Sequence, residues 1–269
     1  MEKFEGVANT TFVPLVARIY ISKKWPDFFY DAKALALEKY LPDDAAKGSF
    51  EYTNIASVAR YYNMDKTVGA FIEKHDPCNV IYLGAGLESA YFRLTEKHGL
   101  KHTRYYECDL PEVTETRRKV FGENQQEKLI GGDMFALEWV DEISDRGLPT
   151  LLIVSGVFQY FHEEKILKFI EGLKKAFPGG QLLFDATSTK GLSFTNWFIK
   201  RTGNASALMY FGVDDAAAFA TKAGTKLLEE TQFFTEVRPL LGKRANLISR
   251  FSMKDSDDGK KSILVLLEL

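Results

Sequence analysis

Short apolar runs alternate with longer amphipathic segments from Cys78 to the C-terminus. The segment 163–177 carries apolar residues at helical spacing, and Pro178-Gly179-Gly180 ends it, which predicts a helix. Seven of the short runs predict strands: residues 79–84, 103–108, 128–131, 150–155, 181–185, 226–234 and 262–267. Strands that alternate with helices predict a parallel sheet covered by helices on both faces.

The first 76 residues have a different pattern. Helical spacing predicts helices at 11–22, 31–41 and 54–74, and no buried strand is apparent among them. We therefore predict a helical cap over residues 1–76 that packs against a core of residues 77–269 as one unit. The charged segment 254–261 predicts a solvated hairpin loop before the last strand.

The length and composition fit one large α/β domain. The chain has 269 residues, of which 45% are hydrophobic and 27% charged, and a formal net charge of -2. This charge gives no global attraction to nucleic acid or to an anionic membrane, so we expect neither as a partner. The two cysteines, Cys78 and Cys108, are typical of buried thiols in a reducing compartment. The N-terminus has no signal-peptide pattern and no run is long enough to cross a bilayer, which predicts a cytoplasmic protein.

A glycine turn follows the first predicted strand. In this turn, Gly84, Ala85 and Gly86 lead from the strand into a helix. Glycine allows unusual backbone dihedrals and lets a ligand approach the backbone, while the helix N-terminus offers unpaired amides. Taken alone, the turn also fits a tight strand-to-helix connection without a ligand.

Acidic residues follow the next two strands. Asp109, with Leu110 after it, lies about 20 residues beyond the turn, where nucleotide-binding α/β units place the carboxylate that binds ribose hydroxyls. Asp133 precedes Met134 and Phe135, and is suited to accept a hydrogen bond from an adenine amino group beside the Phe135 ring. An N-cap role for Asp133 is the structural alternative. Three such sites at carboxyl ends of successive strands predict one nucleoside-binding crevice.

The residues after the turn distinguish between nucleoside cofactors. A dinucleotide site prefers a third glycine where this chain has Ser89, and Glu88 before it would repel a pyrophosphate. A cofactor without phosphates tolerates that carboxylate. The sequence therefore favours S-adenosylmethionine over NAD.

With these motifs, the chain resembles the leucine carboxyl methyltransferase superfamily, especially its bacterial branch of polyketide-pathway O-methyltransferases. In the N-terminal half, the matching stretches are Gly6-Val7-Ala8-Asn9-Thr10, Pro14-Leu15-Val16-Ala17-Arg18, Arg60 with Asp65, and Leu83-Gly84-Ala85-Gly86-Leu87 with Arg93-Leu94. Further along, they are Asp109-Leu110-Pro111-Glu112-Val113, Arg117-Arg118, Asp133 with Trp139, Gly156-Val157 with Tyr160, Phe177-Pro178-Gly179, Phe184-Asp185 and Phe211-Gly212-Val213. The resemblance implies a Rossmann-like, seven-stranded class I methyltransferase sheet with helices on both faces and an N-terminal helical cap.

Two segments depart from the family pattern. Glu88-Ser89-Ala90 stands where the family usually has Asp-Thr-Arg. Ser155, after the fourth strand, replaces a family glutamate near the methionine part of the cofactor, which removes one contact to the cofactor's ammonium group.

The resemblance also implies roles for other residues. Arg60 would bind the carboxylate of S-adenosylmethionine, for which a planar guanidinium is well suited. Arg18 is a candidate for the cofactor or the substrate carboxylate. Tyr160 and Tyr210 follow strand ends, and we expect them to line an aromatic, largely dry pocket between the cap and the sheet. We expect no metal ion.

The predicted function is methyl transfer from S-adenosylmethionine to an oxygen, with a small-molecule carboxylate as the expected acceptor. A carboxylate is ionised at neutral pH and needs no general base, whereas for a phenol His162 is the first candidate base. Methylation of a protein C-terminus is an alternative within this class. A non-catalytic protein that binds S-adenosylmethionine and an NAD-dependent oxidoreductase are alternatives from other classes.

Overall fold

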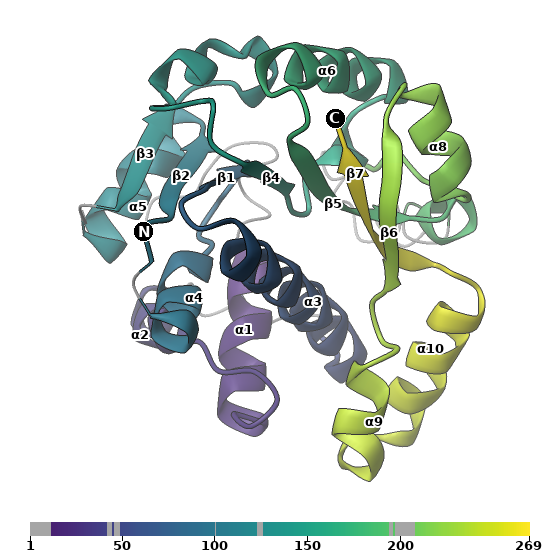
Figure 1. Cartoon of the computed structure of the whole chain (residues 1–269). Coiled ribbons are helices and arrows are strands. Elements are labelled where there is room, and N and C mark those ends of the chain that lie inside the picture. The colour runs from purple at the N-terminus through teal and green to yellow at the C-terminus, as the bar shows by residue number, and fades with distance from the viewer. Residues whose placement is uncertain are drawn as a thin grey trace.

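The computed structural model describes residues 12–41, 45, 49–99, 101–122, 126–193, 196 and 208–269, and Figure 1 shows their arrangement. The strands are β1 (Asn79–Leu83), β2 (Arg104–Asp109), β3 (Glu127–Gly131), β4 (Thr150–Val154), β5 (Gln181–Thr187), β6 (Lys226–Gln232) and β7 (Ser262–Glu268). The α-helices are α1 (Phe12–Lys24), α2 (Ala32–Leu37), α3 (Glu51–His75), α4 (Ala90–His98), α5 (Pro111–Phe121), α6 (Glu163–Ala176), α8 (Ala216–Lys222), α9 (Val237–Leu241) and α10 (Leu247–Asp258). Short 3₁₀ helices are η2 (Glu38–Tyr40), η3 (Met134–Ala136), η4 (Glu138–Glu142), η5 (Phe158–Tyr160) and η7 (Gly242–Arg244).

All seven strands form one sheet with the order β3-β2-β1-β4-β5-β7-β6. The first five strands are parallel, and β7 runs antiparallel to both β5 and β6. The chain direction across the sheet reverses between β1 and β4, so the loops after these strands diverge to opposite sides. In open α/β sheets, this switch point is where a ligand-binding crevice forms at the carboxyl ends of the strands.

Helices cover both faces of the sheet. Alternate residues of each central strand enter different apolar clusters: Val80 and Tyr82 pack with the helices of the cap, whereas Ile81 and Leu83 pack with α6 and α8. In Figure 1, α1, α3 and α4 lie on one side of the sheet and α6 and α8 on the other. Because both faces are buried, β1 and β4 consist of continuous apolar runs without polar alternation.

The structure confirms the predicted fold class. All seven predicted strands are present, within two residues of the predicted bounds. The helices α1 and α3 pack in one apolar cluster with strand residues, although the division at residue 76 stays a prediction. The antiparallel β7 is a difference from the purely parallel sheet expected from the alternation of strands and helices.

The prediction of a hairpin loop at 254–261 is wrong. Residues up to Asp258 belong to α10, which begins after Asn246, whose side chain caps the helix by accepting from Ser249 N. Four of the six charged residues that suggested a loop belong to α10, where Lys254 pairs with Asp258 one turn later; Lys260 and Lys261 lie in the short turn before β7.

Replacing Phe158 tests the packing beneath the carboxyl ends of the strands. The Phe158 ring is buried against Phe169, Phe184 and Phe211. We expect Phe158→Ala to lower the free energy of unfolding by about 3–5 kcal/mol in urea denaturation, because it leaves a cavity. The matched change Phe251→Ala, at an exposed ring, should stay within about 0.5 kcal/mol of wild type. If both changes lowered the free energy of unfolding equally, Phe158 would not be a core residue.

Candidate active site

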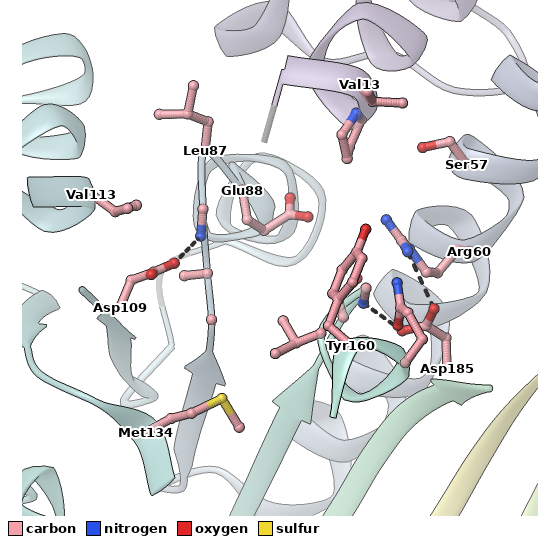
Figure 2. A pocket seen from close by; sticks show the side chains of 18 of the residues that line it. Val13, Ser57, Arg60, Leu87, Glu88, Asp109, Val113, Met134, Tyr160 and Asp185 are labelled. Atoms are coloured by element: carbon pink, nitrogen blue, oxygen red, sulfur yellow. Dashed lines mark hydrogen bonds and ion pairs between the residues drawn. The ribbon is translucent and has the colours of Figure 1, made fainter. Parts of the chain in front are cut away.

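A cavity of about 630 Å³ lies at the switch point, between the carboxyl ends of the strands and the helices α1 and α3. Its volume is typical of sites for small molecules and cofactors. Figure 2 shows the contact of Asp109 with the glycine turn on one side of this cavity, the Arg60–Asp185 pair on the other and Tyr160 between them.

The glycine turn at the end of β1 adopts a backbone that only glycine accepts easily. Gly84 and Gly86 have φ values of 70° and 55°. A Cβ atom at Gly84 would lie 2.5 Å from Cγ2 of Val157, so the turn also packs tightly against the loop after β4. These constraints explain why a Gly-x-Gly sequence stands here.

Two buried arginines hold the carbonyl groups of this turn. Arg117 Nη1 donates to Gly86 O at 2.9 Å and to Glu88 O at 2.7 Å. Arg18 Nη2 donates to Leu87 O at 2.5 Å. Three successive carbonyl groups are therefore fixed by arginine side chains that are each 1% exposed.

Arg18 also belongs to a group of ionised side chains between the cap and α4, which we call the buried ion cluster (Arg18, Asp31, Asp65, Glu88 and Arg93). Asp31 Oδ2 accepts from Arg18 Nη1 at 2.7 Å, from Arg93 Nη1 at 2.9 Å and from Ser89 Oγ at 2.6 Å. Burial raises the pKa of Asp31, but the two arginines outweigh it and hold that pKa well below its usual range. The cluster thus joins the cap to the residues that follow the glycine turn.

Glu88 lines the cavity and is almost fully buried. Its Oε1 lies 2.9 Å from Arg93 Nη1 and 3.8 Å from Arg18 Nη1. Burial raises its pKa, but these cations outweigh that effect and the pKa lies below its usual value, so the side chain is ionised. The carboxylate that argues against a pyrophosphate is therefore present at the site, although the arginines offset part of its charge.

Asp109, at the end of β2, faces the glycine turn. Its Oδ2 accepts from Gly86 N at 2.6 Å and its Oδ1 from Leu110 N at 2.7 Å. Burial raises its pKa, and this outweighs the opposing effect of the two amides, so the pKa lies above its usual value. The two amides hold the carboxylate at the cavity wall, at the strand end where a carboxylate that binds ribose hydroxyls was predicted.

The loop after β3 forms the neighbouring wall. Asp133 Oδ1 accepts from Phe135 N at 2.9 Å, so the residue caps η3 while it also lines the cavity together with Met134. The Phe135 ring packs 4.5 Å from the Phe161 ring, centroid to centroid, and both rings line the cavity. An aromatic wall beside a polar cap is suited to bind an adenine ring.

Arg60 and Asp185 mark the opposite end. Arg60 Nη1 lies 3.2 Å from Asp185 Oδ2, and Asp185 Oδ1 accepts from Gly156 N at 2.5 Å. Burial lowers the pKa of Arg60, but Asp185 and Tyr61 outweigh it, so the guanidinium stays charged. Ser155 Oγ, Arg60 Nε and Ser57 Oγ are buried at this end without a hydrogen-bond partner among the described residues.

Twelve of the thirteen predicted site residues lie on the cavity wall, including Tyr160 and the whole predicted cofactor set: Arg60, Gly84, Ala85, Gly86, Asp109, Leu110, Asp133, Met134, Phe135 and Ser155. Arg18 is the twelfth, but its Nη atoms are taken by Asp31, Ser89 and Leu87, so it positions the turn. Tyr210 does not line the cavity in the described part of the chain; it is half exposed, and its ring lies 4.5 Å from that of His162.

Asp185, Ser57 and Phe233 also line the cavity, although no site role was predicted for them. Asp185 ends a buried stretch of β5, so the rule that found Asp109 and Asp133 at strand ends also applies to it. Ser57 and Phe233 come from α3 and the segment after β6, and no local pattern marks them. The matching stretch at residues 6–10 lies outside the described residues.

Neither a metal site nor a membrane span is found in the described ranges. No group of three or more histidine, cysteine, aspartate or glutamate side chains there is arranged to hold a metal ion. None of the helices there is both long and apolar enough to cross a bilayer.

The strand order, with its antiparallel seventh strand and glycine turn at the switch point, defines a class I methyltransferase fold. The profile of the leucine carboxyl methyltransferase family matches residues 12–174, more than half of the chain. The chain therefore belongs to the leucine carboxyl methyltransferase family.

Individual proteins are similar to this chain in sequence or in fold. The chain is 23% identical over 247 residues to the tetracenomycin polyketide synthesis O-methyltransferase TcmP of Streptomyces glaucescens, which covers 88% of this chain and 89% of that protein. A DUF574 family protein from Streptomyces avermitilis shares the fold with a TM-score of 0.62 at 14% identity, over 94% of this chain and 96% of that one. LepI, solved in complex with SAM, has a TM-score of 0.51 at 15% identity, over 95% of this chain and 64% of that one.

Replacing Asp31 tests the buried ion cluster. We expect Asp31→Asn, which can still cap α2, to lower the free energy of unfolding at pH 7 by about 3–5 kcal/mol, because Arg18 and Arg93 lose their shared anion. The folded pKa of Asp31 lies below its unfolded value, so this stabilisation is complete above about pH 4 and is lost as the pH falls further.

Urea denaturation at several pH values measures this difference. The control Asp27→Asn removes a carboxylate from an exposed pair with Arg244 and should cost no more than about 1 kcal/mol. If the difference in the free energy of unfolding between wild type and Asp31→Asn grew as the pH fell, the lowered pKa of Asp31 would be contradicted.

Proposed function

We propose that the protein transfers a methyl group from S-adenosylmethionine to a carboxylate oxygen of a small, aromatic acceptor. One observation supports this most directly: a single cavity holds a ribose-type carboxylate at one end and a paired arginine at the other. Asp109 would bind the ribose, and Arg60 the amino-acid tail, of a nucleoside that carries such a tail.

The cavity residues fit the cofactor in detail. Asp109 would accept from the ribose hydroxyls, and Asp133 and Phe135 would bind the adenine. Arg60 would bind the methionine carboxylate with its fork of donors, and the unpartnered polar atoms of Ser57 and Ser155 lie at the same end. Asp185, beside Arg60, supplies a carboxylate near the position where the family glutamate is replaced by Ser155.

The chain's own residues act by positioning the reactants. The cofactor supplies an electrophilic methyl group on a sulfonium. The cap helices and the loops after β4 and β5 hold the acceptor in line with that group and exclude water. Apart from the rings of Phe135 and Phe161, the cavity wall carries the aromatic side chains of Tyr61, Tyr160 and Phe233, which would contact the acceptor.

No proton needs to be removed from the proposed acceptor. Among the described residues that line the cavity there is no histidine, lysine or cysteine. His162, the first candidate base for a phenol, instead precedes α6 and packs against Tyr210. A carboxylate acceptor, which is already ionised at neutral pH, suits this wall better than a phenol does.

The similarity to TcmP supports a small-molecule acceptor over a protein C-terminus. That relative is named for O-methylation in polyketide synthesis, and the aromatic walls described here suit a flat ring system. We also place the reaction in the cytoplasm, which the two free and buried thiols of Cys78 and Cys108 support.

Calorimetric titration with S-adenosylmethionine, S-adenosylhomocysteine and NAD tests the proposed cofactor. We expect binding of the first two only. Asp109→Ala should weaken the binding of S-adenosylmethionine and of S-adenosylhomocysteine by about 1.5–3 kcal/mol, because hydrogen bonds to a charged group are lost. The control Glu112→Gln removes a neighbouring, exposed charge of α5 and should leave both affinities unchanged. Binding of NAD without a response to the other two would refute the proposal.

Arg60 is tested by comparing two forms of the cofactor. We expect Arg60→Met to weaken S-adenosylmethionine by about 1.5–3 kcal/mol but to change the affinity for decarboxylated S-adenosylmethionine little, because only the first has the carboxylate that Arg60 binds. Lys66→Met, at an exposed cation of the same helix, is the control. Equal losses for the two ligands would show that Arg60 does not bind the carboxylate.

A further inference from the structure

Helix α10 is packed with its polar side inward. The residues that it buries are mainly polar, and Ser249, Ser256 and Asp257 are each no more than 5% exposed. Leu247, Ile248 and Phe251 are instead 77%, 78% and 73% exposed. Large apolar side chains are normally the first to be buried, so this arrangement is the reverse of an ordinary surface helix.

Specific contacts explain why polar residues of this segment face inward. Asp257 Oδ1 accepts from Phe234 N at 3.1 Å, and its Oδ2 lies 3.5 Å from Arg238. Asn246 N donates to Glu51 Oε1 of α3 at 2.7 Å. The orientation of the helix is therefore fixed by specific contacts, and the outward apolar side is not a consequence of loose packing.

The exposed apolar residues of α10 lie on one side of that helix. Positions 247 and 248 are four and three residues before position 251, which places all three on neighbouring positions of one helix face. Leu240, on the preceding α9, is also exposed. In Figure 1, α9 and α10 form a pair at the end of the molecule farthest from α6. We call this surface the α9–α10 stripe (Leu240, Leu247, Ile248 and Phe251).

Cationic side chains flank the α9–α10 stripe. Lys243, Arg244 and Arg250 are all exposed, within the same short segment. Arg244 pairs with Asp27, but among the described residues no carboxylate lies within 4.0 Å of Lys243 or Arg250. In a chain of net charge -2, this is a local concentration of positive charge beside exposed apolar side chains.

We propose that the α9–α10 stripe binds the surface of an anionic lipid bilayer. Exposed leucine, isoleucine and phenylalanine side chains would enter the boundary between headgroups and acyl chains, while Lys243 and Arg250 would contact anionic headgroups. A symmetric contact with a second copy would bring the same cations of both chains together, which opposes dimerisation through this surface. The proposed binding is peripheral and needs no helix that crosses the bilayer.

The stripe lies close in the chain to a residue of the proposed active site. Phe233, which lines the cavity, lies four residues before α9. A methyltransferase held at a bilayer in this way would meet acceptors that partition into lipid. Lipid binding itself is independent of the acceptor and of methyl transfer, so it can be measured separately.

Co-sedimentation of the full chain with vesicles tests this surface. We compare vesicles of phosphatidylcholine alone with vesicles that also contain phosphatidylglycerol, at low and high salt. Wild type should bind the anionic vesicles at least about tenfold more tightly, and high salt should weaken that binding. Leu247→Ser with Phe251→Ser should reduce it at least about tenfold, and Lys243→Gln with Arg250→Gln by roughly fivefold per cation.

A matched double variant controls for the loss of exposed apolar area. Tyr40→Ser with Leu228→Ser changes two exposed side chains elsewhere on the surface and should bind the vesicles like wild type. The proposal is overturned if neither vesicle is bound, if both are bound equally, or if this control loses as much binding. It is also overturned if sedimentation velocity shows a dimer that Leu247→Ser with Phe251→Ser converts to a monomer. An unchanged affinity of Leu247→Ser with Phe251→Ser for S-adenosylmethionine would show that this double variant is folded.

Discussion

The hydrogen bonds from Arg18 and Arg117 to the glycine turn are the contacts on which the proposed site depends. They hold the carbonyl groups of Gly86, Leu87 and Glu88, while Asp109 accepts a hydrogen bond from the Gly86 amide. A turn that contains two glycines is intrinsically mobile, because glycine loses the most backbone freedom on folding. Buried charged donors offset that cost and keep the ligand-facing backbone in one conformation.

The buried ion cluster joins the N-terminal helices to α4. Arg18 comes from α1, Asp31 precedes α2, and Arg93 comes from α4, so the buried ion cluster cannot form unless the cap is in place. The cap also contributes Arg60 to the end of the cavity where the methionine carboxylate would bind. Its placement thus couples the stability of the fold to the geometry of the site. A single substitution in the cluster, such as one at Asp31, acts on both.

Several parts of the structure could be predicted because their causes are local. The buried strands β1 and β4 are mainly apolar, while Asp109 ends β2 and Asp133 lies two residues after β3, so strand pattern and position at the strand ends identify them. Arg18 and Tyr210 were harder to place. Arg18 stands in a stretch that matches the family and Tyr210 just before one. Arg18 contacts Asp31 and Ser89, which are far from it in the chain, and Tyr210 packs against His162 away from the cavity wall. Helix α10 was missed because its buried positions are polar, so its sequence lacks the apolar period that marks a core helix.

By itself, the sequence determined the seven strands, their alternation with helices, the glycine turn and the class of ligand at the strand ends, because each depends on neighbouring residues and on the chain order. Only the tertiary structure decided which charges neutralise one another, that Asp185 stands beside Arg60, and that Leu247, Ile248 and Phe251 remain outside. These features join residues far apart in the chain. Their free energies depend on burial and on distance in space, and neither quantity is written in the local order of the residues.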